Sequence, residues 1–107
     1  MTEMNNRTVT YGMLLLFFSL IVLAACESQG AKLFWSNRCK ECHTINGKGG
    51  SSGPNLTYVG SKRSREYIVQ QIKDPKSHKP NSDMPSFRNE LTEQEINALA
   101  DYLSRLN

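Results

Sequence analysis

Apolar residues are distributed unevenly along this chain of 107 residues. Sixteen of them lie between Met1 and Ala25, whereas only 25 lie among the 82 residues that follow, which is about 30% of that segment. An average globular domain carries about 45–50% apolar residues, with Gly included. A core built from so few side chains is marginal at this size, so the pattern predicts that a metal, a disulfide or a bound cofactor completes it.

The C-terminal part of the chain shows the clearest helical period. Thr92 and Glu95 have the spacing of a capping box, and Leu91 and Ile96 have that of the hydrophobic staple that accompanies it. The apolar residues that follow recur on one face of a helix: Ile96, Leu99, Ala100, Leu103 and Leu106. A helix that begins after Thr92 and buries this face is therefore predicted.

Two more helices are predicted upstream. The first covers about Gln29 to Asn37. The second covers Arg65 to Lys73, because Ser64 is a typical N-cap residue and the residue before Pro75 avoids the helical region. The segment between residues 43 and 56 is rich in Gly and Ser, and it is predicted to be a loop.

The apolar N-terminal segment has the features of an export signal. Met13 to Ala25 is 13 residues long, while a membrane-spanning helix needs about 20, and small residues precede Cys26 as they do at a signal cleavage site. Leu23-Ala24-Ala25-Cys26 resembles the lipobox of bacterial lipoproteins, in which the cysteine is acylated and becomes the new N-terminus. An ordinary signal peptide before a chance cysteine and an uncleaved anchor are the alternatives.

The resulting division of the chain places a lipoprotein signal peptide at residues 1–25, a lipidated N-terminus with a very short tether at 26–29, and one domain at 30–107. Two or three acyl chains hold a protein firmly, because one chain alone binds a membrane only marginally. We therefore expect the domain to be exported and anchored to a bacterial membrane on its extracytoplasmic side. The sequence leaves open whether this is the inner or the outer membrane.

Cys39-Lys40-Glu41-Cys42-His43 has the Cys-x-x-Cys-His spacing of covalent haem attachment. In such a motif the two thiols add to the vinyl groups of the haem, and the adjacent imidazole binds the iron. Attachment outside the cytoplasm agrees with the predicted export. A thioredoxin-like dithiol would need a βαβ pattern, which is missing, and a structural zinc site would need a fourth ligand at knuckle spacing, for which only His78 remains.

A low-spin haem iron needs a second axial ligand from the opposite side of the ring, and Met84 is the candidate. It is the only methionine after Cys26, and it precedes Pro85, which keeps it in a loop between two predicted helices. One alternative is that Met84 fills a gap in the core, and another is that His78 is the ligand. His78 lies in a strongly polar stretch, which is more typical of a solvated side chain.

The motifs and their order resemble those of small bacterial class I cytochromes c over nearly the whole chain after the signal segment. They are Gly30-x-x-Leu33-Phe34, Cys39-x-x-Cys42-His43, Gly53-Pro54-Asn55-Leu56, Tyr67-Ile68, Met84-Pro85 and Leu99-x-x-Tyr102-Leu103. The resemblance implies an all-α fold of three to five short helices wrapped around one covalently bound haem, with Gly30 packed closely against the last helix. It also implies His43 and Met84 as the axial ligands.

The resemblance further assigns roles to residues around the haem. The carbonyl of Pro54 accepts a hydrogen bond from the ring N–H of His43, which orients the imidazole and makes it a better donor to iron. A simple turn at Gly53-Pro54 is the alternative. Tyr58 and Tyr67 are candidates to donate to a haem propionate, and packing in the core or at its rim is equally compatible with the sequence.

These expectations indicate a carrier of single electrons and not an enzyme. His/Met ligation leaves no open position at the iron and raises the reduction potential relative to two histidines. The predicted partners are redox proteins at the membrane surface, namely a quinol-oxidising complex and a terminal oxidase or reductase, with no small-molecule substrate. The alternatives are a haem-based sensor in which Met84 is labile and a haem subunit of a larger oxidoreductase complex.

The charge of the chain adds a weaker argument about partners. From Cys26 onward the chain has 12 basic and 9 acidic residues, a net charge of +3. Six basic residues fall in segments expected to surround the haem: Lys40, Lys48, Lys62, Arg63, Lys76 and Lys79. A basic rim would steer an acidic redox partner, although an ordinary solvated surface has the same composition. Interleaved aromatic residues for base stacking are missing, so nucleic-acid binding is not expected.

Overall fold

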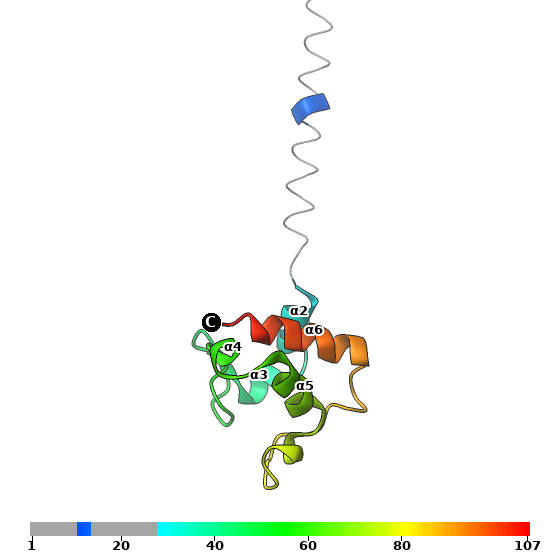
Figure 1. Cartoon of the computed structure of the whole chain (residues 1–107). Helices are drawn as coiled ribbons and strands as arrows, with labels where there is room; N and C mark the ends of the chain where they lie inside the picture. The colour runs from blue at the N-terminus through cyan, green and yellow to red at the C-terminus, as the bar shows by residue number, and fades with distance from the viewer. Residues whose placement is uncertain (1–10, 14–27) are drawn as a thin grey trace, which may run out of the picture.

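The computed structural model describes residues 11–13 and 28–107 (Figure 1). Most of the predicted signal peptide and the predicted lipidation site Cys26 lie outside the described residues. Within the described ranges, no helix combines the length and the apolarity that crossing a bilayer requires.

Residues 28–107 are mainly helical, as the sequence predicts. They contain five α-helices, a short 3-10 helix and a small two-stranded sheet. In chain order these are α2 (Gln29–Ser36), α3 (Cys39–Cys42), β1 (Thr44–Ile45), β2 (Lys48–Gly49), α4 (Val59–Lys62), α5 (Arg65–Lys73), η1 (Pro75–Ser77) and α6 (Glu93–Ser104). The prediction of an all-α fold with short helices is confirmed.

The three longer helices begin at side-chain caps that satisfy free backbone N–H groups. The hydroxyl of Ser28 accepts a hydrogen bond from the N–H of Ala31 at 3.2 Å, and that of Ser64 accepts one from Tyr67 at 3.1 Å. At the start of α6 both halves of the predicted capping box are present. The N–H of Glu95 donates to the Thr92 hydroxyl at 3.1 Å, and the Thr92 N–H donates to the Glu95 carboxylate at 2.8 Å.

Helix α2 crosses α6 at very close range, and α5 packs on α6 beside it (Figure 1). Gly30 is at the crossing, where a Cβ atom would lie only 2.2 Å from the carbonyl oxygen of Ala98 and 2.5 Å from the Cβ of Tyr102. The close approach expected at Gly30 is therefore confirmed. Only glycine allows the two backbones to come this near.

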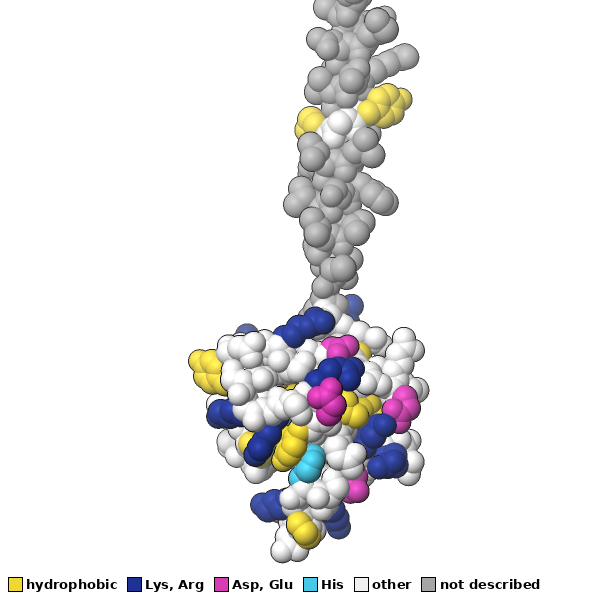
Figure 2. Space-filling view, in the orientation of Figure 1, with side chains coloured by type: hydrophobic (Ala, Val, Ile, Leu, Met, Phe, Trp, Pro, Cys, Tyr) yellow, Lys and Arg dark blue, Asp and Glu magenta, His cyan; other side chains and the backbone are white. Residues whose placement is uncertain are grey.

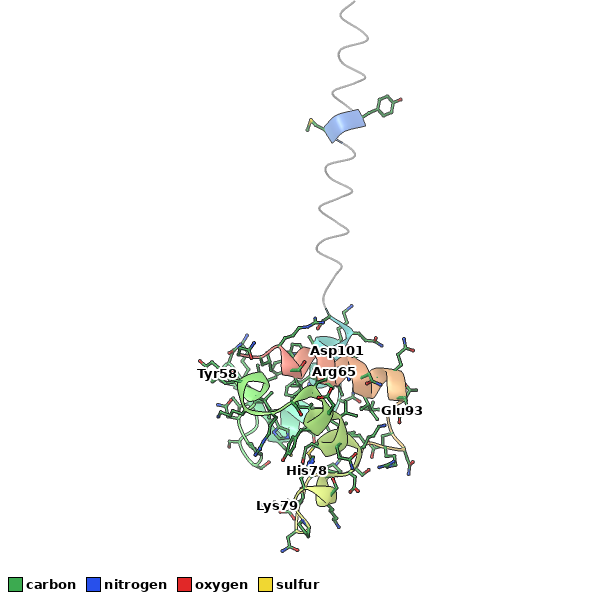
Figure 3. All side chains as sticks on the ribbon, viewed as in Figure 1. Tyr58, Arg65, His78, Lys79, Glu93 and Asp101 are labelled. Carbon is green, nitrogen blue, oxygen red and sulfur yellow. The ribbon has the colours of Figure 1, made fainter. Side chains whose placement is uncertain are left out.

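Two ion pairs join α5 to α6 at opposite ends of α5. Nε of Arg65 lies 2.6 Å from the carboxylate of Asp101, and Nζ of Lys73 lies 2.6 Å from that of Glu93. Figure 3 shows Arg65 and Asp101 side by side where the two helices pack. Both pairs are partly exposed, so each adds only modestly to stability.

The buried apolar cluster of the described residues is small. Its members are Phe34, Ile45, Ile68, Ile72, Phe87, Ile96, Leu99, Ala100 and Leu103. They come mostly from the inner faces of α2, α5 and α6. Half-buried apolar side chains from the helices and from the connecting segments pack around this cluster, and Cys39 of α3 and Met84 are among them.

The segment predicted to be a loop after His43 differs from the expectation. It contains an antiparallel hairpin in which Thr44 pairs with Gly49 and Ile45 with Lys48. The turn residues Asn46 and Gly47 have φ angles of 51° and 78°, which is the backbone of an Asn-Gly hairpin turn. The prediction was wrong here because Gly and Ser enrichment concealed this turn signal between two very short strands.

Candidate functional site

The two cysteines lie on α3, a helix of a single turn. Cys39 and Cys42 are three positions apart, so their side chains emerge on the same side of the helix. Both thiols are free of disulfide bonds; Cys39 is half-buried and Cys42 is exposed. Burial raises the pKa of the Cys39 thiol, so its surroundings favour an uncharged sulfur. A thioether is also uncharged, and the position therefore suits a covalent bond to an apolar ring system.

His43 ends α3 and turns the chain away from it. Its backbone N–H still donates to the Cys39 carbonyl at 2.9 Å, while its own φ and ψ of −111° and 142° are extended. The imidazole thus starts directly beside the helix that holds the two thiols. The local geometry of these five residues therefore places two thiols on α3 and one imidazole directly after it.

The imidazole of His43 is oriented by the chain that returns after the hairpin. Its Nδ1 lies 2.7 Å from the carbonyl oxygen of Pro54. A carbonyl can only accept, so Nδ1 is the donor, and in the neutral imidazole Nε2 then keeps its lone pair. That lone pair is the one that a metal ion would take, and the hydrogen bond on the other side of the ring makes it a stronger donor.

Gly53 permits this contact because it lies against the imidazole and has no side chain. A Cβ at residue 53 would lie 2.8 Å from Cε1 of His43 and 3.0 Å from its Nδ1. The Gly53 N–H also donates to the Cys42 carbonyl at 2.7 Å. The segment Gly53-Pro54 is therefore more than a turn. Its backbone contacts both the backbone of Cys42 and the imidazole ring of His43.

Met84 lies in the long connection between η1 and α6. Its side chain is half-buried and packs against the same apolar cluster as Cys39. The connection is attached to the end of α5, because Phe87 N–H donates to the Ile72 carbonyl at 3.0 Å and the Ser86 hydroxyl donates to the Lys73 carbonyl at 2.5 Å. The thioether is thus held at a defined place without being part of a helix.

The remaining candidates occupy different surroundings. Tyr58 precedes α4 and is 59% exposed, at the left edge of the domain in Figure 3. Tyr67 is on α5, where its ring stacks on that of His78 with centroids 3.8 Å apart. His78 is exposed, follows η1 and lies below α5 in the same view. Its Nδ1 is 2.9 Å from the side-chain oxygen of Gln71.

Gln71 was not singled out from the sequence. Its side-chain nitrogen lies 3.5 Å from Sδ of Met84, and its side-chain oxygen faces His78. The only signal available in the sequence was its position four residues after Tyr67, which places both on one face of α5. That spacing is ordinary in any helix and does not by itself indicate a site.

The donor set fits a haem bound through its vinyl groups. It consists of two free thiols one helical turn apart, an imidazole oriented through its Nδ1, a thioether on a separate segment and half-buried apolar side chains nearby. Within residues 11–13 and 28–107, no three side chains of His, Cys, Asp and Glu are grouped as a metal cluster, which is the arrangement that a structural zinc site would need.

Comparison with known proteins agrees with this geometry. A family model described as cytochrome c matches residues 27–107. Over 91 residues, the chain is 30% identical to a protein of Bacillus subtilis (strain 168) named cytochrome c oxidase subunit 2. This similarity covers 73% of the present chain but 26% of that relative, so the chain spans about a quarter of the relative's length.

Proposed function

Because the chain belongs to the cytochrome c family and is an electron-transfer haem protein, we propose that it is a membrane-tethered carrier of single electrons with His43 and Met84 as the axial ligands of its haem. Haem c is bound covalently through Cys39 and Cys42. The observation that carries the proposal is the 2.7 Å contact between His43 Nδ1 and the Pro54 carbonyl. It leaves Nε2 as the one lone pair of that ring available to iron.

The protein side of the site supports reversible electron exchange. The haem supplies a one-electron iron couple when it is bound. His43 is held by Pro54, and the segment that carries Met84 is held by the last residues of α5. Two ligands that are fixed by their own supports move little between oxidation states, so the protein contributes a small reorganisation during transfer. A neutral thioether as second ligand also favours the reduced state relative to a second imidazole.

An absorption spectrum of the reduced holoprotein, recorded with and without carbon monoxide, tests the ligation. We expect sharp low-spin bands that carbon monoxide leaves unchanged, because no coordination position is free. Met84→Ala should bind carbon monoxide readily. Leu91→Ala is the matched control, since Leu91 is also half-buried against the apolar cluster and is not a candidate ligand. Bands of the wild-type protein that shift with carbon monoxide would contradict the proposal and favour a sensor with a labile Met84.

The membrane tether is a proposal that rests on the N-terminal sequence. Ser28 caps α2, so the folded domain begins two residues after Cys26. Acyl chains on Cys26 would therefore keep the domain at the lipid surface. We expect cell fractionation to find the haem protein with membranes on the extracytoplasmic side and Cys26→Ser in the soluble extracytoplasmic fraction. Equal distribution of both proteins would contradict lipidation at Cys26.

The proposed partners are redox proteins of the respiratory chain, a quinol-oxidising complex and a terminal oxidase or reductase. The similarity to a protein named as an oxidase subunit supports a terminal oxidase on the accepting side. The six basic residues expected around the haem are all exposed: Lys40, Lys48, Lys62, Arg63, Lys76 and Lys79. Figure 2 shows Lys and Arg side chains on both sides of the histidine on the face it displays. Such a surface attracts an acidic partner, so electron-transfer rates should fall as salt concentration rises.

A second candidate function follows from the same similarity. The relative named as oxidase subunit 2 is about four times as long as the matched region, so a domain of this kind also occurs within a larger chain. The present protein would then act as a haem subunit of an oxidoreductase complex. Purification from gently solubilised membranes separates the two functions, because a subunit remains with its complex at high salt and a free carrier does not.

A further inference from the structure

A chain of two side-chain contacts joins exposed His78 to Met84 through Gln71. Nδ1 of His78 is 2.9 Å from Oε1 of Gln71, and Nε2 of Gln71 is 3.5 Å from Sδ of Met84. These residues come from three separate places: α5, the turn after η1 and the connection to α6. The chain therefore links the polar surface of the domain to the sulfur that is the candidate iron ligand.

The chemistry of the sulfur determines how these groups are oriented. A thioether can only accept a hydrogen bond, so the amide NH₂ of Gln71 faces Met84. The amide oxygen then faces His78, and an oxygen can only accept. Nδ1 of His78 must therefore carry a proton, whether the imidazole is neutral or charged. Each contact fixes the direction of the other, and the amide cannot reverse without losing both.

His78 is itself held against α5 by stacking. Its ring lies on that of Tyr67 with an interplanar angle of 6°, and the guanidinium carbon of Arg63 lies 4.6 Å from the centroid of the Tyr67 ring. Tyr67 and Gln71 are one helical turn apart, so His78 contacts two neighbouring side chains on one face of α5. This double contact orders an exposed imidazole that would otherwise be solvated and mobile.

We propose that Gln71 is a positioning residue for the thioether of Met84, and that His78 acts on the iron ligand through Gln71. This inference rests on the proposed function, since it requires Met84 as the axial ligand. A thioether sulfur has two lone pairs; one would bind the iron, and the second accepts the N–H of Gln71. The donated hydrogen withdraws electron density from the sulfur, which stabilises Fe(II) relative to Fe(III) and raises the reduction potential.

Replacement of Gln71 tests the first half of the proposal. In Gln71→Leu the side-chain volume is kept and the donor is lost. Loss of one hydrogen bond should lower the equilibrium constant for reduction by a common redox partner about threefold to tenfold, which is roughly 30 to 60 mV for one electron. Gln70→Leu is the matched control, because Gln70 is the adjacent residue of α5 and donates to the Ser77 hydroxyl at 3.3 Å, away from the sulfur.

Replacement of His78 tests the second half. His78→Phe keeps a flat ring to stack on Tyr67 but removes the donor to Gln71. We expect a shift of the potential in the same direction as in Gln71→Leu, and smaller. In the double variant the His78 change should have no further effect, because its action requires the Gln71 amide. A potential that is unchanged in either single variant, or a His78→Phe effect that persists fully in the Gln71→Leu background, overturns the inference.

One spectroscopic measurement keeps this test separate from the test of the proposed function. Oxidised holoprotein with a methionine ligand shows a weak long-wavelength charge-transfer band from sulfur to Fe(III). If wild-type protein lacks the band, Met84 is not the ligand and the proposed function fails together with the inference. If the band is present while the Gln71 and His78 variants keep the wild-type potential, the ligation stands and only the inference fails.

Discussion

Single atoms determine the chemistry of His43. Its Nδ1 contacts the Pro54 carbonyl, and Gly53 leaves just enough room for the ring beside it. The hydrogen bond orients the ring, and if Nε2 binds the haem iron as proposed, it would make that nitrogen a stronger donor and stabilise Fe(III). The proposed Gln71 contact acts in the opposite sense on the other ligand. If both contacts act as proposed, the His43–Pro54 bond lowers the reduction potential and the Gln71–Met84 bond raises it. Each effect would have about the size expected from one hydrogen bond.

Gly53→Ala should disturb the histidine side of this balance. The new Cβ would lie 2.8 Å from Cε1 of His43 and 3.1 Å from the Cys42 carbonyl oxygen, so the ring and the backbone must move apart. We expect the hydrogen bond to Pro54 to lengthen, the reduction potential to rise, and the free energy of unfolding to fall by about 1–3 kcal/mol. Redox titration and denaturant unfolding of the holoprotein measure both quantities.

The adjacent exposed residue supplies the control for that experiment. Ser52→Ala changes a side chain in the same segment without entering the space under the imidazole, and it should leave both quantities near their wild-type values. If Gly53→Ala lowers stability but leaves the potential unchanged, the contact at Gly53 affects packing only and the electronic role assigned to the Pro54 bond is wrong.

Individual helices differ in how far their own sequence specifies them. Helix α5 begins and ends where predicted, and α2 agrees within a residue. Helix α6 begins where predicted but ends at Ser104, before Leu106. The starts of α5 and α6 and the end of α5 were predictable because Ser64, Thr92 and Pro75 are local signals that need no tertiary context. The one-turn helices α3 and α4 were not predicted, since four residues contain no period. Helix α4 depends on a distant partner: the N–H of Gly60 donates to the Leu106 carbonyl at 2.8 Å.

The residues of the candidate site also differ in how far the sequence alone could identify them. Cys39, Cys42 and His43 could be predicted because they lie in one short sequence motif. The contact at Pro54 was expected because Gly53-Pro54-Asn55-Leu56 resembles a motif of class I cytochromes c. Gln71 could not be predicted, because its contacts depend on how the segment after η1 folds back along α5. The expectation that Tyr67 donates to a propionate remains untested, while the structure adds its stacking on His78.

The crossing of α2 and α6 can be tested at the scale of these elements. In Gly30→Ala the Cβ would lie 2.2 Å from a backbone oxygen of α6, which cannot rotate away, so the two helices must separate. We expect the free energy of unfolding to fall by about 3 kcal/mol, measured by denaturant unfolding of the holoprotein. Gln29→Ala changes the neighbouring exposed residue of α2 and should have little effect. Equal stability of the two variants would contradict the close crossing.

The folded domain at residues 28–107 has a small core for its length. The buried apolar cluster of the described residues comprises nine side chains, and several half-buried apolar residues around it, Met84 and Leu56 among them, are incompletely covered by protein. A haem contributes a large apolar surface, and covalent attachment keeps it in place. We therefore expect the fold and the cofactor to depend on each other.

The double variant Cys39→Ser/Cys42→Ser tests this dependence. It removes both thioether bonds while leaving every helix cap and the α2–α6 crossing in place. Without covalent haem we expect loss of the cooperative thermal transition and of most helical circular dichroism, because the remaining cluster cannot offset the conformational entropy of the chain. Cys26→Ser is the matched cysteine control, and it should retain covalent haem and the wild-type thermal midpoint. A double variant that unfolds cooperatively without haem would show that the protein core is sufficient, and the haem would then serve electron transfer alone.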